Sequence, residues 1–149
     1  MAADREAAWS GRSVSLALRR VDGVPVAFLE GELDVESVPE VERFLRRNLG
    51  PLFFKRHLVL DLERVRFIDS SFVTLLVSLV HRFQAERTEL VLVRPVGAVR
   101  RVLALVGLPN LVPVYDAVDD AVAALESRVA PLIPPPFEAG IAAARAARA

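Results

Sequence analysis

The spacing of apolar residues divides most of the chain into short strands and helices. Ser13 to Leu18 alternates between polar and apolar residues, and Asp22-Gly23 then leads into the apolar run Val24 to Leu29, which predicts an antiparallel β-hairpin. Compact runs rich in branched residues, typical of buried strands, occur at 58–62, 89–93 and 111–114. Apolar residues at helical spacing predict helices that begin near residues 38, 72, 96 and 118. Because strands that alternate with helices favour parallel pairing, we expect one α/β domain with a mixed, mostly parallel β-sheet, an N-terminal β-hairpin and about four packed α-helices.

The most informative stretch lies where the strand at 58–62 leads into the second helix. Asp69-Ser70-Ser71 consists of residue types that accept hydrogen bonds from the free amides of a first helical turn, so the helix is expected to start there. Its buried stripe is expected to comprise Phe72, Leu75, Leu76, Leu79, Val80 and Phe83. Ser71 begins the opposite polar wedge, which continues through Thr74, Ser78, His81, Arg82 and Ala85. This placement predicts an exposed Ser71 hydroxyl, more outward than that of Ser70, where the helix macrodipole favours an anion.

The same stretch resembles the signature of the STAS domain family (sulfate transporter and anti-sigma factor antagonist). Bacterial antagonists of this family carry an apolar strand, then Phe-Ile/Met-Asp-Ser-Ser-Gly-Leu and a helix; here the run is Phe67-Ile68-Asp69-Ser70-Ser71-Phe72-Val73. The resemblance covers roughly residues 13–127 and includes three further segments in the family's order, which are Gly31-Glu32-Leu33-Asp34, Pro95 to Leu108 and Val112 to Tyr115. Phe72 is a departure, because it stands where the family has glycine.

The resemblance implies a protein-binding switch and not an enzyme. Unmodified antagonists of this family bind a serine protein kinase that acts as an anti-sigma factor, and this binding frees a sigma factor. The family's second serine is the phosphorylated one, which is Ser71 here, and phosphorylation ends the binding. In the family, the aspartate at the place of Asp34 lies on the kinase-binding surface. We therefore expect phosphorylation at Ser71 and a partner-binding surface made of Asp34, Asp69, Ser70, Phe72 and Val73.

These residues also have purely structural interpretations. Asp34 could cap the turn before Ser37-Val38-Pro39-Glu40, which has the sequence of a capping box, and Ser71 could be a helix cap. Phe72 continues the inward stripe, yet glycine in the family argues against a required core side chain. We favour an outward or groove-lining Phe72 that serves as an aromatic anchor and sets partner specificity. The same bulk beside Ser71 keeps an alternative open, an unphosphorylated STAS scaffold subunit of a multiprotein regulatory assembly or transport complex.

The two ends of the chain lie outside the family pattern. Residues 1–12 are expected to form an N-terminal arm, and residues 13–128 the STAS domain. The segment 131–149 begins with Pro-Leu-Ile-Pro-Pro-Pro-Phe, an extended linker by composition, and ends in an alanine- and arginine-rich tail too short for a stable isolated helix. This segment either packs on the domain through Leu132, Ile133 and Phe137 or serves as a partner-binding arm.

Composition narrows the classes of function. The 19 basic and 19 acidic residues give no net charge, which disfavours direct binding of nucleic acid or an acidic membrane. With no cysteine and two histidines, disulfides and most metal sites are not expected. The sequence has no phosphate-binding glycine loop, no nucleophile elbow and no evident base for the serines, so we expect neither an enzyme nor a cofactor.

The same sequence contains neither a signal peptide nor an apolar run long enough to span a membrane, so the expected location is the cytoplasm. A second copy of the chain is a further partner that the sequence leaves open. A small lipid or nucleotide bound in a groove has no motif to support it.

Overall fold

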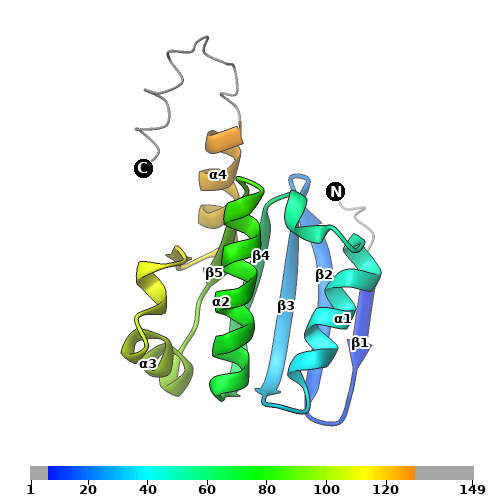
Figure 1. Ribbon diagram of the computed structural model, residues 1–149, viewed down its shortest axis with the longest axis vertical. Helices are drawn as coiled ribbons and strands as arrows, with labels where there is room; N and C mark the ends of the chain where they lie inside the picture. Colours follow the sequence, from blue (N-terminus) through cyan, green and yellow to red (C-terminus); the bar gives the residue numbers. More distant parts are fainter. Residues whose placement is uncertain (1–6, 130–149) are drawn as a thin grey trace.

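The computed structural model describes residues 7–129 of the 149-residue chain (Figure 1). Its strands are β1 (Ala7–Ser10), β2 (Val14–Val21), β3 (Val24–Leu33), β4 (Leu58–Ile68), β5 (Leu90–Val93) and β6 (Val114–Tyr115). Its α-helices are α1 (Val38–Leu49), α2 (Ser70–Ala85), α3 (Gly97–Leu105) and α4 (Val118–Val129), with short 3-10 turns at η1 (Phe53–Lys55) and η2 (Leu108–Asn110). The predicted linker and tail at 131–149 lie outside the described residues.

The strands form one sheet in the order β1-β2-β3-β4-β5-β6. β2 pairs antiparallel with β1 and β3, whereas β3, β4, β5 and β6 are parallel. Asp22 and Gly23 join β2 to β3 as predicted, with positive φ angles of 53° and 83°, which suit a two-residue hairpin turn. The predicted α/β fold, with a mixed sheet, an N-terminal hairpin and four helices, is confirmed.

β1 extends the predicted hairpin by a third antiparallel strand. Ala7–Ser10 pairs with β2, so these residues of the expected N-terminal arm belong to the sheet. Ala7 and Trp9 are half-buried against the core, while Ala8 and Ser10 are exposed. Alanine is depleted in strands, which explains why this alanine-rich segment gives no strand pattern in the sequence.

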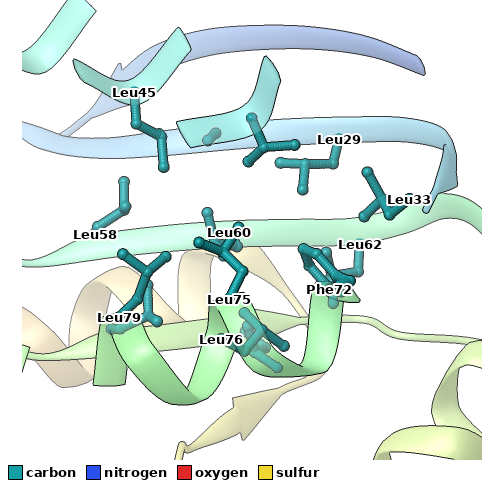
Figure 2. Packing of buried hydrophobic residues seen from close by; sticks show 14 of the residues in the cluster. Leu29, Leu33, Leu45, Leu58, Leu60, Leu62, Phe72, Leu75, Leu76 and Leu79 are labelled. Carbon is teal, nitrogen blue, oxygen red and sulfur yellow. The ribbon is translucent and has the colours of Figure 1, made fainter. Parts of the chain in front are cut away.

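The main core lies between the sheet and helices α1, α2 and α3. Leu58, Leu60 and Leu62 of β4 belong to it and lie beside α2 (Figure 2). The six residues predicted as the inward stripe of α2 are all buried. Full burial of one such side chain contributes roughly 1.5–3 kcal/mol, so this layer holds α2 firmly against the sheet.

α4 packs on the opposite side of the sheet, where it contacts β4, β5 and β6. The apolar cluster on this side comprises Val26, Val59, Val91, Val93, Ala121, Val122 and Leu125. Within residues 7–129, α4 is the helix that belongs to this cluster, so β1, β2 and most of β3 remain without helical cover on this side. In the same part of the chain, no helix is long and apolar enough to cross a membrane.

Candidate functional site

The side chain of Asp69 holds the junction between β4 and α2. Asp69 is the N-cap residue, with an extended backbone (φ −121°, ψ −173°), and α2 begins at Ser70. Its Oδ1 accepts the backbone N–H of Ser71 at 2.9 Å and the Ser71 hydroxyl at 2.5 Å. One carboxylate oxygen therefore satisfies a free amide of the first turn and also orients the Ser71 side chain.

This geometry sets the charge state of Asp69. The hydrogen bond from the Ser71 hydroxyl, assisted by backbone N–H groups, holds the pKa of Asp69 below its ordinary value. Partial burial acts in the opposite direction and is outweighed. Asp69 is therefore an anion at neutral pH, placed at the N-terminus of α2 where the macrodipole favours negative charge.

The two serines of the junction differ in exposure. Ser70 is exposed, whereas Ser71 is half-buried because its hydroxyl turns back to Asp69. The prediction that Ser71 is the more outward of the two is therefore wrong. The rest of the polar wedge is confirmed, since its remaining members are all exposed, namely Thr74, Ser78, His81, Arg82 and Ala85. Helical periodicity places Ser71 on the correct face, but the capping bond, which periodicity does not report, draws its side chain inward.

The loop between β3 and α1 lies directly beside this junction. The backbone N–H of Asp69 donates to the carbonyl of Leu33 at 3.1 Å, and Asp34 is the next residue. Asp34 is half-buried, and its Oδ1 accepts the backbone N–H groups of Glu36 and Ser37, each at 3.0 Å. The structure thus brings the Asp34 loop next to Asp69. The Asp34 carboxylate accepts hydrogen bonds that close the turn before α1, as expected if its role is structural.

Ser37 does not form the predicted capping box with Glu40. Its side chain is buried, donates to the carbonyl of Glu32 at 2.7 Å and accepts the N–H of Asp34 at 2.9 Å. α1 begins at the next residue without a side-chain cap bond from Ser37. The hydroxyl instead connects β3 to the turn and thereby fixes the position of Asp34.

Phe72 is a core residue, with 0% of its surface exposed. Its ring lies between α2 and the sheet, in the same cluster as Leu33 and Leu62 (Figure 2). The prediction of an outward or groove-lining Phe72 that contacts a partner is therefore wrong. The physical reason is its helical position, which continues the buried stripe of Leu75 and Leu76. Val73 is half-buried at the edge of the core and keeps part of its surface free.

Three exposed apolar residues near the carboxyl ends of parallel strands were not predicted. Val35, Phe67 and Val96 are 68%, 48% and 44% exposed. Val35 follows β3 and Phe67 lies near the end of β4, and these two strands are paired up to Leu33 and Ile68 beside the junction. Val96 follows the shorter strand β5, whose last residue, Val93, pairs with Asp61. Val35 and Phe67 are therefore the exposed apolar side chains on the two strand ends that meet at the junction. The exposure of Val35 could have been predicted from the sequence, because it is an apolar residue between two acidic residues in a turn.

Asp61 is a buried carboxylate that sequence reasoning also missed. It is 8% exposed, and burial raises its pKa above the ordinary value although the N–H of Glu63 donates to it at 2.9 Å. Its burial could have been predicted from the sequence, because Asp61 stands between Leu60 and Leu62 in an apolar strand. Because side chains alternate along a strand, Asp61 points to the face opposite that of the two leucines and takes no part in the Asp69 junction.

Replacing Asp69 with alanine is expected to lower the free energy of unfolding by about 1 kcal/mol at pH 7, a typical loss for a helix N-cap. Because its folded pKa lies below its unfolded value of ~3.9, the carboxylate stabilises the fold above that value, and this stabilisation is lost as the pH falls through the folded pKa. Urea unfolding of wild type and variant across this pH range measures the effect. Asp69→Asn is the control, since asparagine caps equally well and does not titrate. A difference between wild type and Asp69→Ala that stays constant in acid would contradict the role of the charge.

Comparison with protein families matches residues 15–121 to the STAS domain. Among proteins of curated function, none matches the sequence significantly. The matched range contains the Asp69-Ser70-Ser71 junction.

Solved structures of the same fold include several anti-sigma factor antagonists. The antagonist from Mycobacterium paratuberculosis is 28% identical, with a TM-score of 0.67 over 79% of this chain and 99% of its own. A candidate antagonist from Thermotoga maritima is 25% identical, with a TM-score of 0.66 over 73% of this chain and 92% of its own. Unphosphorylated SpoIIAA, a Bacillus protein, is 22% identical over 75% of this chain and 96% of its own, with a TM-score of 0.62, and shows the shared fold alone. Since the STAS match spans most of the chain, this protein belongs to the STAS domain family.

Proposed function

We propose that this STAS protein is an anti-sigma factor antagonist, which binds a serine protein kinase acting as an anti-sigma factor and releases a sigma factor until Ser71 is phosphorylated. The observation that carries the proposal is the Asp69–Ser71 cap, which holds an acceptor serine at a helix N-terminus next to the Asp34 loop. The likeness to antagonists from Mycobacterium paratuberculosis and Thermotoga maritima supports this class of partner. The protein acts by binding and performs no catalysis of its own.

The unphosphorylated surface suits a protein partner. Ser70 is exposed at the start of α2, and the apolar side chains of Val35 and Phe67 are exposed after β3 and near the end of the neighbouring strand β4. Asp34 and Asp69 supply carboxylates already held by backbone N–H groups. Such a mixture of apolar anchors and fixed polar groups is the usual anatomy of an interface.

A phosphate on Ser71 would change this surface in two ways. It would remove the hydroxyl proton that Ser71 donates to Asp69, and so abolish one of the two capping bonds. It would also add about −1.5 to −2 charges beside a carboxylate that is already ionised. Burying this group in an interface without a cation costs several kcal/mol, and every ~1.4 kcal/mol is tenfold in affinity. One phosphate is therefore enough to switch the binding off.

Ser70 is the competing acceptor, because it is the more exposed of the two serines. Two arguments favour Ser71. The family's rule selects the second serine, and the Ser71 hydroxyl is already bonded to a carboxylate at the helix start. SpoIIAA is known in a phosphorylated form, but at 22% identity its likeness extends to the fold only, so the acceptor in this chain requires direct mapping.

The test is to incubate the purified protein with each anti-sigma kinase of the source genome and ATP, and to locate the phosphate by mass spectrometry. We expect a single phosphate on Ser71, normal labelling of Ser70→Ala and no labelling of Ser71→Ala. Phosphate on Ser70, or full labelling of Ser71→Ala, would contradict the assignment.

Binding to the labelling kinase provides the second measurement. Ser71→Asp is expected to weaken the complex by at least about tenfold, because it adds a second carboxylate beside Asp69. Ser71→Ala, which removes the hydroxyl without adding charge, is the matched control and should still bind. Equal losses in the two variants would indicate that the hydroxyl itself, and not the charge, is required.

The alternative of an unphosphorylated scaffold subunit depended on the bulk of Phe72 beside the serine. Since Phe72 is fully buried, it neither blocks the approach of a kinase to Ser71 nor offers a separate apolar contact. The structure therefore removes the observation that favoured this alternative. Absence of labelling by every candidate kinase would be the result that revives it.

A further inference from the structure

The side of the sheet that carries α4 is covered over only part of its width. A row of cross-strand neighbours runs along this side through Ala8, Ala17, Phe28, Asp61 and Val93. Exposure rises steadily along the row: Val93 and Asp61 are buried, Phe28 and Ala17 are half-buried, and Ala8 is exposed. The row thus runs from the apolar layer beneath α4, past the buried Asp61, onto bare sheet. We call the uncovered region around Ala8, Ala17 and Phe28 the open sheet face.

The open sheet face is hollowed. A depression of about 610 Å³ lies over it, within the range of ~300–1,000 Å³ that is usual for binding sites. Ala8 and Ala17 leave room there because their side chains are small, and the Phe28 ring forms an apolar wall with the Arg19 guanidinium 4.9 Å from its centre. Ionisable side chains of both signs line the depression, from Arg19, Glu30, Asp61, Glu63 and Arg64. The hollow suits a segment with several apolar side chains and little net charge.

We propose that residues 131–149 of this same chain dock on the open sheet face, with Leu132, Ile133 and Phe137 supplying the apolar contacts. α4 is the last described element, and it ends at Val129, at the same end of the sheet as the β2–β3 turn (Figure 1). The chain therefore leaves α4 on the side of the sheet that carries the hollow.

The distances permit this docking. Neighbouring strands lie about 4.8 Å apart, so the span from β3 to β1 is about 10 Å. Leu132, Ile133 and Phe137 follow Val129 by three, four and eight residues, so at ~3.1 Å per residue in an extended proline-rich conformation they reach about 9, 12 and 25 Å beyond α4. Val21 and Val24, beside the β2–β3 turn, are half-buried at the edge of the α4 cluster. They form the first apolar contacts available between the end of α4 and the hollow.

The composition of the segment fits the surface. Its four prolines, Pro131, Pro134, Pro135 and Pro136, carry no backbone N–H. A segment of this kind can lie across the face of a sheet without leaving many donors unsatisfied. Its charged side chains are Glu138, Arg145 and Arg148. The segment and the lining of the hollow thus both carry acidic and basic side chains.

Thiol labelling of the full-length chain tests the proposal. The chain has no cysteine, so Ala17→Cys introduces a single thiol into the hollow. We expect a small aromatic disulfide reagent to label it about tenfold more slowly than in a second protein that also carries Leu132→Ser, Ile133→Ser and Phe137→Ser, because a docked segment limits access. Ser78→Cys, on the exposed wedge of α2, is the matched control and should label at equal rates in both backgrounds.

Two results would overturn the proposal. Equal labelling of Ala17→Cys in both backgrounds would show that the segment does not cover the face. Protection that persists in the triple-serine background and grows with protein concentration would identify a second copy of the chain as the occupant. Ala8→Cys, on the exposed side of the edge strand, repeats the measurement if Ala17→Cys disturbs folding.

Discussion

Replacing Phe72 with alanine is expected to lower the free energy of unfolding by about 3–5 kcal/mol, the usual range for deleting a buried aromatic side chain. The ring is fully buried in the first turn of α2 and shares the main core with Leu33 and Leu62. The sheet on one side and the helix backbone on the other leave little scope for the cavity to collapse. Domains of this kind are stable by about 5–15 kcal/mol in total, so the variant would be only marginally folded. Urea unfolding followed by circular dichroism measures the loss.

Val73→Ala is the control for Phe72→Ala. Val73 is the next residue of the same helical turn but is only half-buried, so its truncation should cost about 1 kcal/mol. If the two variants lost similar stability, Phe72 would not be a core residue. The outward orientation expected from the family's glycine would then regain its support.

The burial of Phe72 also has a consequence for the site. Phe72 immediately follows Ser71, and its ring anchors the first turn of α2 in the core while Ser70 stays exposed. The Asp69 carboxylate holds the same turn from the outside through two bonds to Ser71. Ser71 is therefore held from both sides, and a phosphate on its hydroxyl would remove one of the two bonds to Asp69 while the Phe72 ring stays in the core.

The sequence predicted the parts of the fold that depend on a repeated pattern of apolar residues or on residue types with a strong local preference. The six inward positions of α2 were correct because an apolar stripe that spans 12 residues, from Phe72 to Phe83, leaves one orientation of the helix against the sheet. The Asp22-Gly23 turn was correct because few residue pairs adopt two consecutive positive φ angles. The motif Asp69-Ser70-Ser71 correctly located the junction between β4 and α2, because few side chains can cap the start of a helix.

The sequence did not predict the partners of individual side-chain hydrogen bonds or the short alanine-rich strand β1. Asp69 is the cap, and Ser71 turns inward, because the Asp69 carboxylate points toward Ser71. The spacing of apolar residues in the sequence does not reveal the direction of that side chain. Ser37 has the sequence of a capping residue, but it bonds to the carbonyl of Glu32, which β4 pairing holds nearby. β1 forms because β2 offers a free edge, a fact that only the assembled sheet contains.

Replacing Gly31 with alanine is expected to lower the free energy of unfolding by about 3 kcal/mol or more. Gly31 lies within β3 at a φ of 105°, where a residue with a side chain is strained by about 1–3 kcal/mol. An added Cβ would also overlap the carbonyl oxygen of Ser13 at the start of β2. This oxygen accepts the N–H of Glu32 at 3.0 Å, so it cannot retreat without loss of that bond. Under the proposed function, the same displacement should also weaken partner binding, because Leu33 and the Asp34 loop follow Gly31 directly.

Gly23→Ala separates the two causes. Gly23 has a similar positive φ of 83°, but nothing lies within 4 Å of an added Cβ, so only the conformational cost of about 1–2 kcal/mol applies. Parallel urea unfolding of the two variants should therefore show a clearly larger loss for Gly31→Ala, and the excess measures the steric contact with Ser13. Equal losses would show that backbone conformation alone requires glycine at position 31. A stable Gly31→Ala variant would mean that the start of β2 can move away from β3, which the paired register of Val14 and Gly31 argues against.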